Sequence, residues 1–266
     1  MRFKFDHDFH IHSYLSLCSG NPEQNAERIL LYAKENGLNT LCLTDHFWDE
    51  RVEGASGWYK LQNREHIKEI LPLPQSETVK FHFGAETDMD MHGTIGVTKK
   101  TFEELDFVII PTTHLHMEGF TISSEDSQSV ERRAELWISR LDDLLSRDLD
   151  FSRVGIAHLA CSLIAKSRPD YFAILEKLQT AELERIFTKC AALGVGIELN
   201  QSDMSFSDAD AEPILRIFKI AKACGCKFYC GSDAHNPDYF KTTKEVFERA
   251  IDLLELTEND KFILEA

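Results

Sequence analysis

The chain has 266 residues, of which 43% are hydrophobic, and it carries 45 acidic against 29 basic side chains, a net charge of −16. This length fits one large domain or two small ones, and the apolar content supports a sizeable core rather than a disordered chain. The acidic balance argues against a nucleic-acid or anionic-membrane surface. The sequence contains no run of about 18 apolar residues that could span a bilayer. The first residues lack the apolar core of a signal peptide.

The cysteines indicate a reduced compartment. There are seven, an odd number, and most lie among apolar residues, which is typical of a cytoplasmic protein with buried thiols. Cys224, Cys226 and Cys230 lack the two-residue spacing of a zinc knuckle, so core packing is favoured over metal binding there.

Helices are predicted where apolar periodicity is bounded by cap residues. The first has Asn21 as its N-cap, Pro22 at its first position and Gly37 at its end. Further helices are expected over residues 64–71, 127–147, 182–193, 213–224 and 242–254. The segment 47–61 holds two tryptophans without periodicity and predicts a long loop, which could cap a pocket.

Short apolar runs between the helices predict strands. They cover residues 4–12, 40–44, 79–86, 107–111, 154–158, 195–199 and 227–230. Strands that alternate with helices indicate right-handed crossovers and a parallel sheet. The length favours a closed α/β barrel in a single domain, residues 1–266, although about seven strands is one short of the usual eight. An open doubly wound sheet is the alternative.

A His or a carboxylate stands at the carboxyl end of nearly every predicted strand. The residues concerned are His10, His12, Asp45, His46, Glu86, His114, His116, His158, Glu198, Asn200, Asp233 and His235. Because the carboxyl ends of parallel strands share one face, we expect these side chains to converge. Strand side chains alternate with period two, so Asp8, His10 and His12 are expected on one face.

Imidazoles and carboxylates together suit zinc, manganese or iron. There are more of them than one ion needs, so we expect two or three divalent ions. Metal ions roughly 3.5–4 Å apart can clamp the attacking and leaving oxygens of a phosphoryl transfer, and they lower the pKa of a bound water.

The strand-end motifs resemble those of the PHP (polymerase and histidinol phosphatase) superfamily. The matching motifs are Asp8-Phe9-His10-Ile11-His12-Ser13, Thr44-Asp45-His46, Gly84-Ala85-Glu86, His114, Ala157-His158 and Gly231-Ser232-Asp233-Ala234-His235. They span residues 8 to 235 in the family's order. The resemblance implies a distorted (β/α)7 TIM-like barrel with up to three metal ions at the carboxyl ends of the strands.

The resemblance also implies which residues bind each ion. The first ion would be held by His10, His12, Glu86 and Asp233. Glu86 would bridge to a second ion held by His114 and His158, with His116 as the alternative to His114. His46 and His235 would hold a third ion.

The third site departs from the family's usual pattern. Members often carry another His six residues after the second His of the first motif, and here that position is Cys18. A thiolate binds zinc or iron, so the third site either uses this softer ligand or is weak or empty. Cys18 as a small buried residue is the alternative.

Other polar residues are assigned secondary roles. Asp8 and Asp45 are expected to orient ligands or turns rather than to bind metal. Glu198 and Asn200 either orient substrate or satisfy loop amides. Phosphate recognition needs positive side chains, and the best placed by sequence are Lys166 and Arg168, with Lys99, Lys100, Arg132 and Arg133 as alternatives. His7, His66 and His92 fit no pattern and are expected at the surface.

These inferences predict a cytoplasmic metal-dependent phosphoesterase. A metal-bound hydroxide would attack phosphorus in line, with no separate catalytic side chain assigned. The expected substrate is a small phosphomonoester such as L-histidinol phosphate or a nucleotide, and neither a nucleic-acid polymer nor a membrane is expected as a partner. The alternatives are a metallohydrolase that cleaves an amide or lactone, and a non-catalytic metal-binding module.

Overall fold

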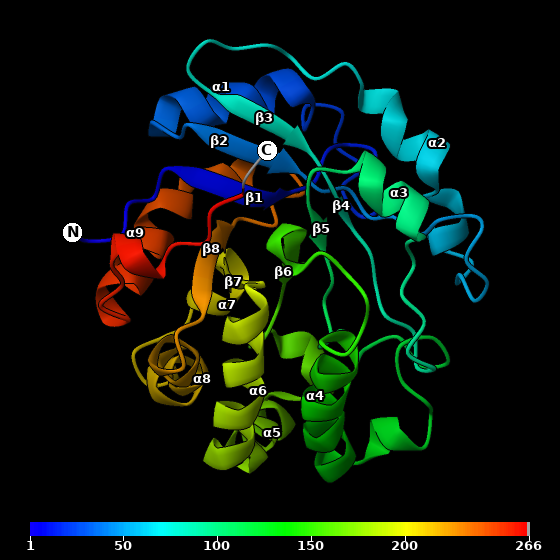
Figure 1. Ribbon diagram of the computed structural model, residues 1–266, viewed down its shortest axis with the longest axis vertical. Helices are drawn as coiled ribbons and strands as arrows, with labels where there is room; N and C mark the ends of the chain where they lie inside the picture. The colour runs from blue at the N-terminus through cyan, green and yellow to red at the C-terminus, as the bar shows by residue number, and fades with distance from the viewer. Residues whose placement is uncertain (265–266) are drawn as a thin grey trace.

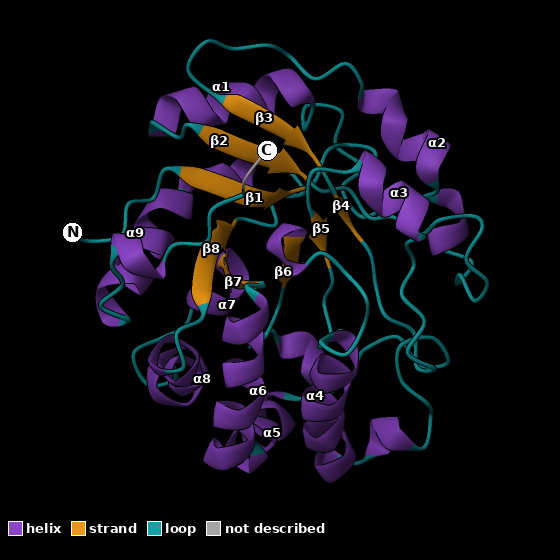
Figure 2. Cartoon of the chain, viewed as in Figure 1, coloured by secondary structure: helices purple, strands orange, loops and turns teal. Residues whose placement is uncertain are grey.

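Parallel strands ringed by helices make up the computed structural model, which describes residues 1–264 (Figures 1 and 2). Within this range the strands are β1 (His7–Ile11), β2 (Thr40–Leu43), β3 (Lys80–Phe83), β4 (Ala85–Glu86), β5 (Val108–Ile109), β6 (Val154–Ile156), β7 (Gly196–Asn200) and β8 (Lys227–Gly231). They pair in the order β1-β2-β3 and β4-β5-β6-β7-β8, every pair parallel.

β3 and β4 are one extended segment that changes its pairing partner at Gly84. Gly84 N donates to Leu43 O at 2.8 Å, whereas Ala85 N donates to Phe107 O at 3.1 Å. A Cβ on Gly84 would lie 2.4 Å from Phe107 O, so only glycine fits at this crossing point. The segment therefore links the two sheets.

The other two sheet edges meet at the metal-ligand motifs. Asp233 N donates to His10 O at 2.7 Å, and His12 N donates to Ala234 O at 3.1 Å. With β3 and β4 counted as one strand, seven strands close into a ring, which confirms the predicted distorted (β/α)7 barrel rather than the open sheet. That residues 1–266 form one domain stays a prediction, and residues 265–266 lie outside the described part.

Helices cover the outside of the strands (Figure 2). They are α1 (Ala26–Asn36), α2 (Arg64–Ile67), α3 (Lys99–Glu104), α4 (Val130–Leu144), α5 (Arg168–Lys177), α6 (Thr180–Leu193), α7 (Gln201–Met204), α8 (Ala211–Ala223) and α9 (Thr243–Leu253). Figure 1 shows α4, α5, α6 and α8 gathered at one end of the molecule, with α9 beside β1 and α1 next to β2. None of the helices in the described range is long and apolar enough to cross a membrane.

The predicted helices need correction in two respects. Helix α1 begins later than predicted, because Asn25 rather than Asn21 is its N-cap and accepts from Arg28 N at 2.9 Å. Gly37, at φ 71°, ends it as expected. Helix α5 is the longest of three helices that were not predicted, the other two being α3 and α7. Its N-cap is Ser167, and Pro169 lies in its first turn.

Strand β1 does not alternate regularly. Its pairing with β2 shifts register between Asp8 and Ile11, so Asp8 does not join His10 and His12. The Asp8 carboxylate instead accepts from Tyr32 OH of α1 at 3.0 Å. The prediction of one shared face is therefore wrong for Asp8, because it assumed an unbroken period of two.

Aromatic side chains form a buried apolar cluster that is separate from the main hydrophobic core. Phe9, Phe107, Tyr229 and Phe262 come from segments around the barrel, and the ring centroids of Phe107 and Tyr229 are 5.3 Å apart. His7, expected at the surface, is buried here, and its Nε2 accepts from the backbone of the β8 strand. This cluster supports the strand ends from within.

The predicted loop 47–61 packs onto the barrel. Trp48 and Tyr59 are buried against Phe120 in a small cluster of their own. Trp58 reaches His46, with ring centroids 4.9 Å apart. The loop therefore contacts a predicted metal ligand directly.

Candidate metal centre

Four side chains from three strand ends place one ligand atom each around a common point. The Nε2 atoms of His10 and His12 lie 3.0 Å apart. Glu86 Oε2 lies 3.4 and 3.3 Å from these two atoms, and Asp233 Oδ1 lies 3.4 and 3.1 Å from them. A tetrahedron with ligand bonds of about 2.0 Å has edges of about 3.3 Å. These five separations therefore match the spacing of ligand atoms around one metal ion.

Hydrogen bonds on the far side of both imidazoles determine where their protons lie. His10 Nδ1 donates to Glu198 Oε1 at 2.6 Å, since a carboxylate only accepts. Ser16 Oγ donates to Asp45 at 2.7 Å and accepts from His12 Nδ1 at 2.8 Å. In the neutral imidazoles both Nε2 atoms then carry lone pairs that face each other, which requires a cation between them.

Glu86 gives a second sign of a missing cation. It is fully buried, yet neither carboxylate oxygen has a hydrogen bond partner among residues 1–264. Burial raises the pKa of Glu86, but the charges of His46 and His10 outweigh this effect and hold it well below its usual range. A buried ionised carboxylate without hydrogen bonds is costly unless a cation compensates it. The donor set thus fits a divalent ion.

Protons substitute for that cation when metal is absent. Burial lowers the pKa of His10, but Glu198, Glu86 and Asp233 outweigh burial and raise it well above its ordinary value. Metal binding must displace these protons, so affinity is expected to fall as the pH is lowered.

Glu86 also belongs to a second group, with His114 and His158, whose ligand atoms all lie within 4.8 Å of one another. Glu86 Oε1 is 3.4 Å from His158 Nε2. His114 Nδ1 lies 3.1 Å from Asp88 Oδ1, and Tyr59 OH donates to Asp88 Oδ2 at 2.7 Å. This pairing keeps the proton of His114 on Nδ1 and leaves Nε2 able to bind metal.

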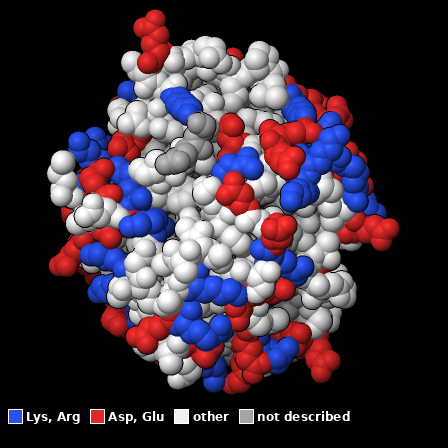
Figure 3. All heavy atoms as spheres, in the orientation of Figure 1, with Lys and Arg blue, Asp and Glu red and all other residues white. Residues whose placement is uncertain are grey.

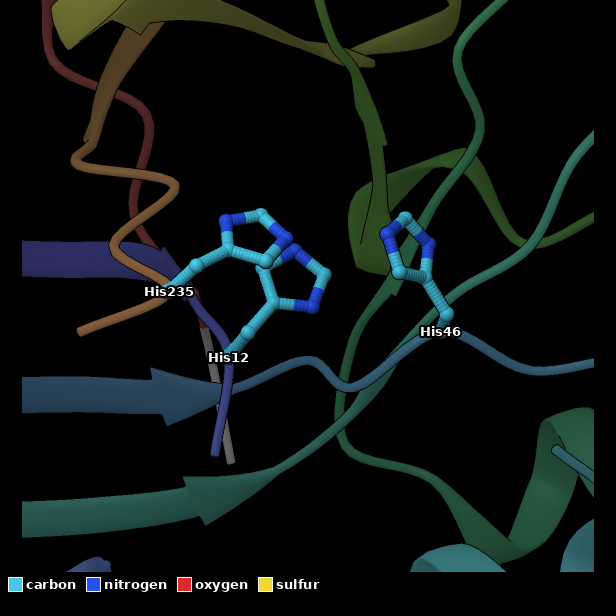
Figure 4. Close-up of side chains that lie close together, drawn as sticks. All are labelled: His12, His46 and His235. Atoms are coloured by element: carbon cyan, nitrogen blue, oxygen red, sulfur yellow. The ribbon is translucent and has the colours of Figure 1, made fainter. Parts of the chain in front are cut away.

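His12, His46 and His235 form a third group. Figure 4 shows the three imidazoles projecting toward one another from three separate segments. The rings of His12 and His235 stack with centroids 4.1 Å apart, and that of His46 lies 4.4 Å from His12. Burial lowers the pKa of His46 and that of His235, the latter to about 3. His235 is therefore neutral at pH 7, the form of imidazole that binds metal.

Cys18 and His116 lie outside these groups. Both are exposed, and neither joins a set of three ligand atoms within residues 1–264. Although part of the Cys18 side chain is exposed, desolvation of the sulfur, together with the charges of Glu86 and Asp233, raises its pKa to about 12. The thiol is then protonated at neutral pH and is a poor ligand without an ion to ionise it. The geometry brings in His114 rather than His116.

Two predicted ligands have an unusual backbone conformation. His158 has φ 61° and Asp233 has φ 53°, in the left-handed region that residues other than glycine rarely enter. Close by, a Cβ on Gly231 would lie 2.1 Å from Glu198 Oε1 and 2.7 Å from the Cβ of His10. Strain and close approach of this kind concentrate at functional sites, where the surrounding packing sustains them.

A cavity of about 680 Å³ adjoins these groups, and His158 and Asp233 form part of its wall. The predicted phosphate contacts Lys166 and Arg168 both line it as well. Each already has a carboxylate partner, because Lys166 pairs with Glu118 at 2.6 Å and Arg168 pairs with Asp210 at 2.5 Å. Both bases are therefore engaged in ion pairs with carboxylates.

Asn200 and the alternative basic residues make other contacts within the protein. Asn200 is buried, and its side chain caps α7 by accepting from Ser202 N at 2.9 Å. Arg133 is buried and donates to backbone carbonyls, including Leu115 O at 2.7 Å. Arg132 pairs with Asp126, and Lys99 with Asp148.

Some important residues were beyond the sequence prediction. Glu198, left open by the sequence, orients His10 and also accepts from His158 N at 3.1 Å. Asp88 stands two residues after Glu86, and that strand spacing is a signal that could have found it. No sequence pattern points to Tyr59, which reaches Asp88 from the long loop.

The chain is similar to known proteins over most of its length. The PHP domain model matches residues 8–202. A "Probable phosphatase" of Caldicellulosiruptor bescii is 22% identical over 226 residues, which cover 83% of this chain and 77% of that protein. Another, of Thermoanaerobacter pseudethanolicus, is 25% identical over 230 residues, which cover 86% of this chain and 78% of that protein.

A solved structure extends the likeness to the whole chain. It is the histidinol phosphate phosphatase of Lactococcus lactis, complexed with zinc, L-histidinol and phosphate. It aligns with a TM-score of 0.62 at 16% identity and covers 97% of this chain and 98% of that one. Fold and site together define a (β/α)7 barrel of a phosphatase-like class. The chain belongs to the PHP domain family, because the family model matches more than half of its length.

Proposed function

We propose that this chain is a metal-dependent phosphoesterase that hydrolyses a small phosphomonoester. The observation that supports this most is that one carboxylate oxygen each of Glu86 and Asp233 lies 3.1–3.4 Å from the Nε2 atoms of His10 and His12, whose lone pairs face each other at 3.0 Å. Such a site favours a divalent ion over a proton, since one proton cannot satisfy four acceptors.

Two or three divalent ions of zinc, manganese or iron are proposed. The proposed ligands are His10, His12, Glu86 and Asp233 for the first ion, Glu86, His114 and His158 for the second, and His46 and His235 for the third. When bound, such ions act as Lewis acids toward phosphoryl oxygens and lower the pKa of water to make a hydroxide nucleophile.

The chain's own residues set the geometry of this site. Glu198 holds His10 through Nδ1, and Asp88 holds His114 in the same way. Ser16 holds His12 and is itself fixed by Asp45. These contacts keep a lone pair of each imidazole directed at the ion before substrate arrives, so little reorganisation is needed.

The substrate is proposed to be histidinol phosphate-like or nucleotide-like. The cavity of about 680 Å³ is within the range of small-molecule sites. Lys166, Arg168 and Asn200 remain proposed substrate contacts, and the two bases would have to exchange a carboxylate partner for phosphate. Acidic and basic side chains are interspersed on the face in Figure 3. With the net charge of −16, this favours a small substrate over a nucleic acid.

Cys18 is proposed as a further ligand of the third ion. Metal analysis of Cys18→Ala tests this: loss of the third ion with the other two retained supports it, whereas unchanged occupancy refutes it. The measurement matters because the thiol, with its pKa of about 12, would need the ion itself to ionise it.

Metal analysis combined with a substrate panel tests the proposed function. The panel holds L-histidinol phosphate, p-nitrophenyl phosphate, nucleoside monophosphates, a phosphodiester, a lactone and a cyclic amide. We expect phosphomonoester hydrolysis that is lost in His10→Ala and kept in His92→Ala, since His92 is an exposed loop residue. Turnover of only the lactone or amide would favour the alternative hydrolase, and full metallation without any turnover would favour a binding module.

A further inference from the structure

The Nδ1 atom of His46 has no partner that would fix the orientation of the ring. It lies 2.9 Å from Glu86 Oε2, itself an atom of a predicted ligand, but no residue in the range 1–264 forms a hydrogen bond with it. The Nδ1 atom of His235, by contrast, donates to Asp233 O at 2.7 Å. Packing contacts are therefore needed to hold the His46 ring toward the third ion.

The rings of two consecutive residues, Trp58 and Tyr59, lie against the His46 ring. Their centroids are 4.9 and 6.1 Å from that of His46, with interplanar angles of 68° and 86°. In such edge-to-face pairs the electropositive edge of one ring meets the electronegative face of the other. A divalent ion withdraws electrons from the imidazole that binds it, and a more electropositive ring is attracted more strongly to the electron-rich rings beside it. The two contacts therefore favour His46 in its metal-binding position.

Trp58 is 36% exposed, although it is a large apolar side chain. The next residue, Tyr59, already anchors the loop, because it is fully buried against Trp48 and Phe120 and its OH donates to Asp88 Oδ2 at 2.7 Å. The ring centroids of Trp58 and Tyr59 are 4.8 Å apart. A fixed residue thus supports the indole, and the contact of the indole with a predicted metal ligand is not needed to anchor the loop.

We propose that Trp58 is a positioning residue, which orients His46 for binding of the third ion. This inference rests on the metal set of the proposed function and adds a residue that supports it. Tyr59 acts on a different ion, because its hydroxyl group reaches the second group of ligands through Asp88 and His114. Two adjacent side chains therefore serve two separate ions, and a change at each should affect its own ion alone.

Stepwise titration of metal-free protein with Co²⁺, in which bound metal is counted by metal analysis, tests this assignment. Trp58→Leu is expected to lower the affinity for the third ion by about three- to tenfold, the effect of one aromatic pair, and to leave the affinities for the first two ions unchanged. Trp58→Phe keeps an aromatic ring and should restore the affinity to within about twofold of wild type. Tyr59→Phe keeps its ring and loses its hydroxyl group, so it should weaken binding of the second ion and not of the third.

Two reference variants make the titration interpretable. His46→Ala removes a proposed ligand of the third ion alone, so the step that it abolishes is the step that fills the third site. Leu61→Ala is the matched control, because Leu61 is an apolar residue of the same loop that is 62% exposed. This variant should bind every ion like wild type, and circular dichroism of each metal-free variant checks that it folds.

Several outcomes would overturn the role of Trp58. They are wild-type affinity for the third ion in Trp58→Leu, an equal loss for all ions, a Trp58→Phe protein as weak as Trp58→Leu, and a wild-type protein that binds only two ions. If Trp58→Leu does not fold, Trp58→Gln, whose polar side chain suits an exposed position, replaces it with the same expected loss. No hydrolysis of p-nitrophenyl phosphate by metal-loaded wild type would overturn the proposed function, whereas the measured affinities would still decide the role of Trp58.

Discussion

Replacing Glu198 by glutamine perturbs the contact that orients a predicted ligand without changing the size of the side chain. Glu198 is 1% exposed, and both of its oxygens are used. Oε1 accepts from His10 Nδ1 at 2.6 Å, and Oε2 accepts from His158 N at 3.1 Å. Glutamine has only one acceptor oxygen, so its amide N–H must face one of these two donors. Either His10 loses its proton-fixing partner or the turn at His158 is disturbed.

The expected size of the effect follows from this geometry. A hydrogen bond to a charged group contributes about 1.5–3 kcal/mol, or roughly 10- to 150-fold in an equilibrium constant. Removal of the carboxylate behind a metal-ligating histidine typically lowers metal affinity by about 10- to 100-fold. We therefore expect Glu198→Gln to weaken binding of the first ion by about 10- to 100-fold.

Competition with a chromophoric zinc chelator measures this affinity, and circular dichroism of the metal-free protein checks that the variant folds. Glu212→Gln, an exposed substitution on α8, is the matched control and should bind zinc like wild type. A folded Glu198→Gln protein with wild-type affinity for every ion would refute the argument that this carboxylate orients His10.

Three further substitutions are predicted to have distinct effects. Arg140→Met should destabilise the fold by about 3–5 kcal/mol in urea unfolding, because the buried guanidinium donates to four backbone carbonyls of the loops around the site. Tyr59→Phe should lower the affinity for the second ion by roughly three- to tenfold in metal titration, because Asp88 loses the donor that fixes its hydrogen bond to His114. In metal-free protein the pKa of Asp203, raised to about 7 by burial, lies above its unfolded value. The folded state therefore holds this proton more tightly, and stability falls as the pH rises from about 4 to 7. In Asp203→Asn, the fall in the free energy of unfolding between pH 4 and pH 7 should be smaller by up to about 4 kcal/mol, which urea unfolding at a series of pH values measures.

The strand ends explain why so much of the site could be predicted. Glu86, His114 and His158 each follow a short apolar run, and parallel strands bring such positions to one face whatever their separation in the sequence. The same argument gave the seven-stranded barrel once residues 79–86 were taken as one strand. The positions of the strand ends were enough to predict that these ligands lie near one another.

Features that depend on tertiary contacts escaped prediction. The register shift in β1 turns Asp8 toward Tyr32, and the alternation of apolar and polar residues in the sequence does not indicate this shift. Lys166 looked available for phosphate, but its partner Glu118 lies on a different loop. Tyr59 contributes through a loop whose path depends on packing against Phe120. In each case two segments far apart in the sequence are in contact, and such a contact produces no periodic pattern in the sequence.

Phosphate release as a function of metal added back to metal-free protein tests the central claim most directly. With p-nitrophenyl phosphate as substrate, we predict no release without metal, a rise with each added equivalent of zinc or manganese, and saturation at two or three ions per chain. His10→Ala should remain inactive at the same metal concentrations. Activity that survives removal of all metal, or full occupancy without any phosphate release, would contradict the account.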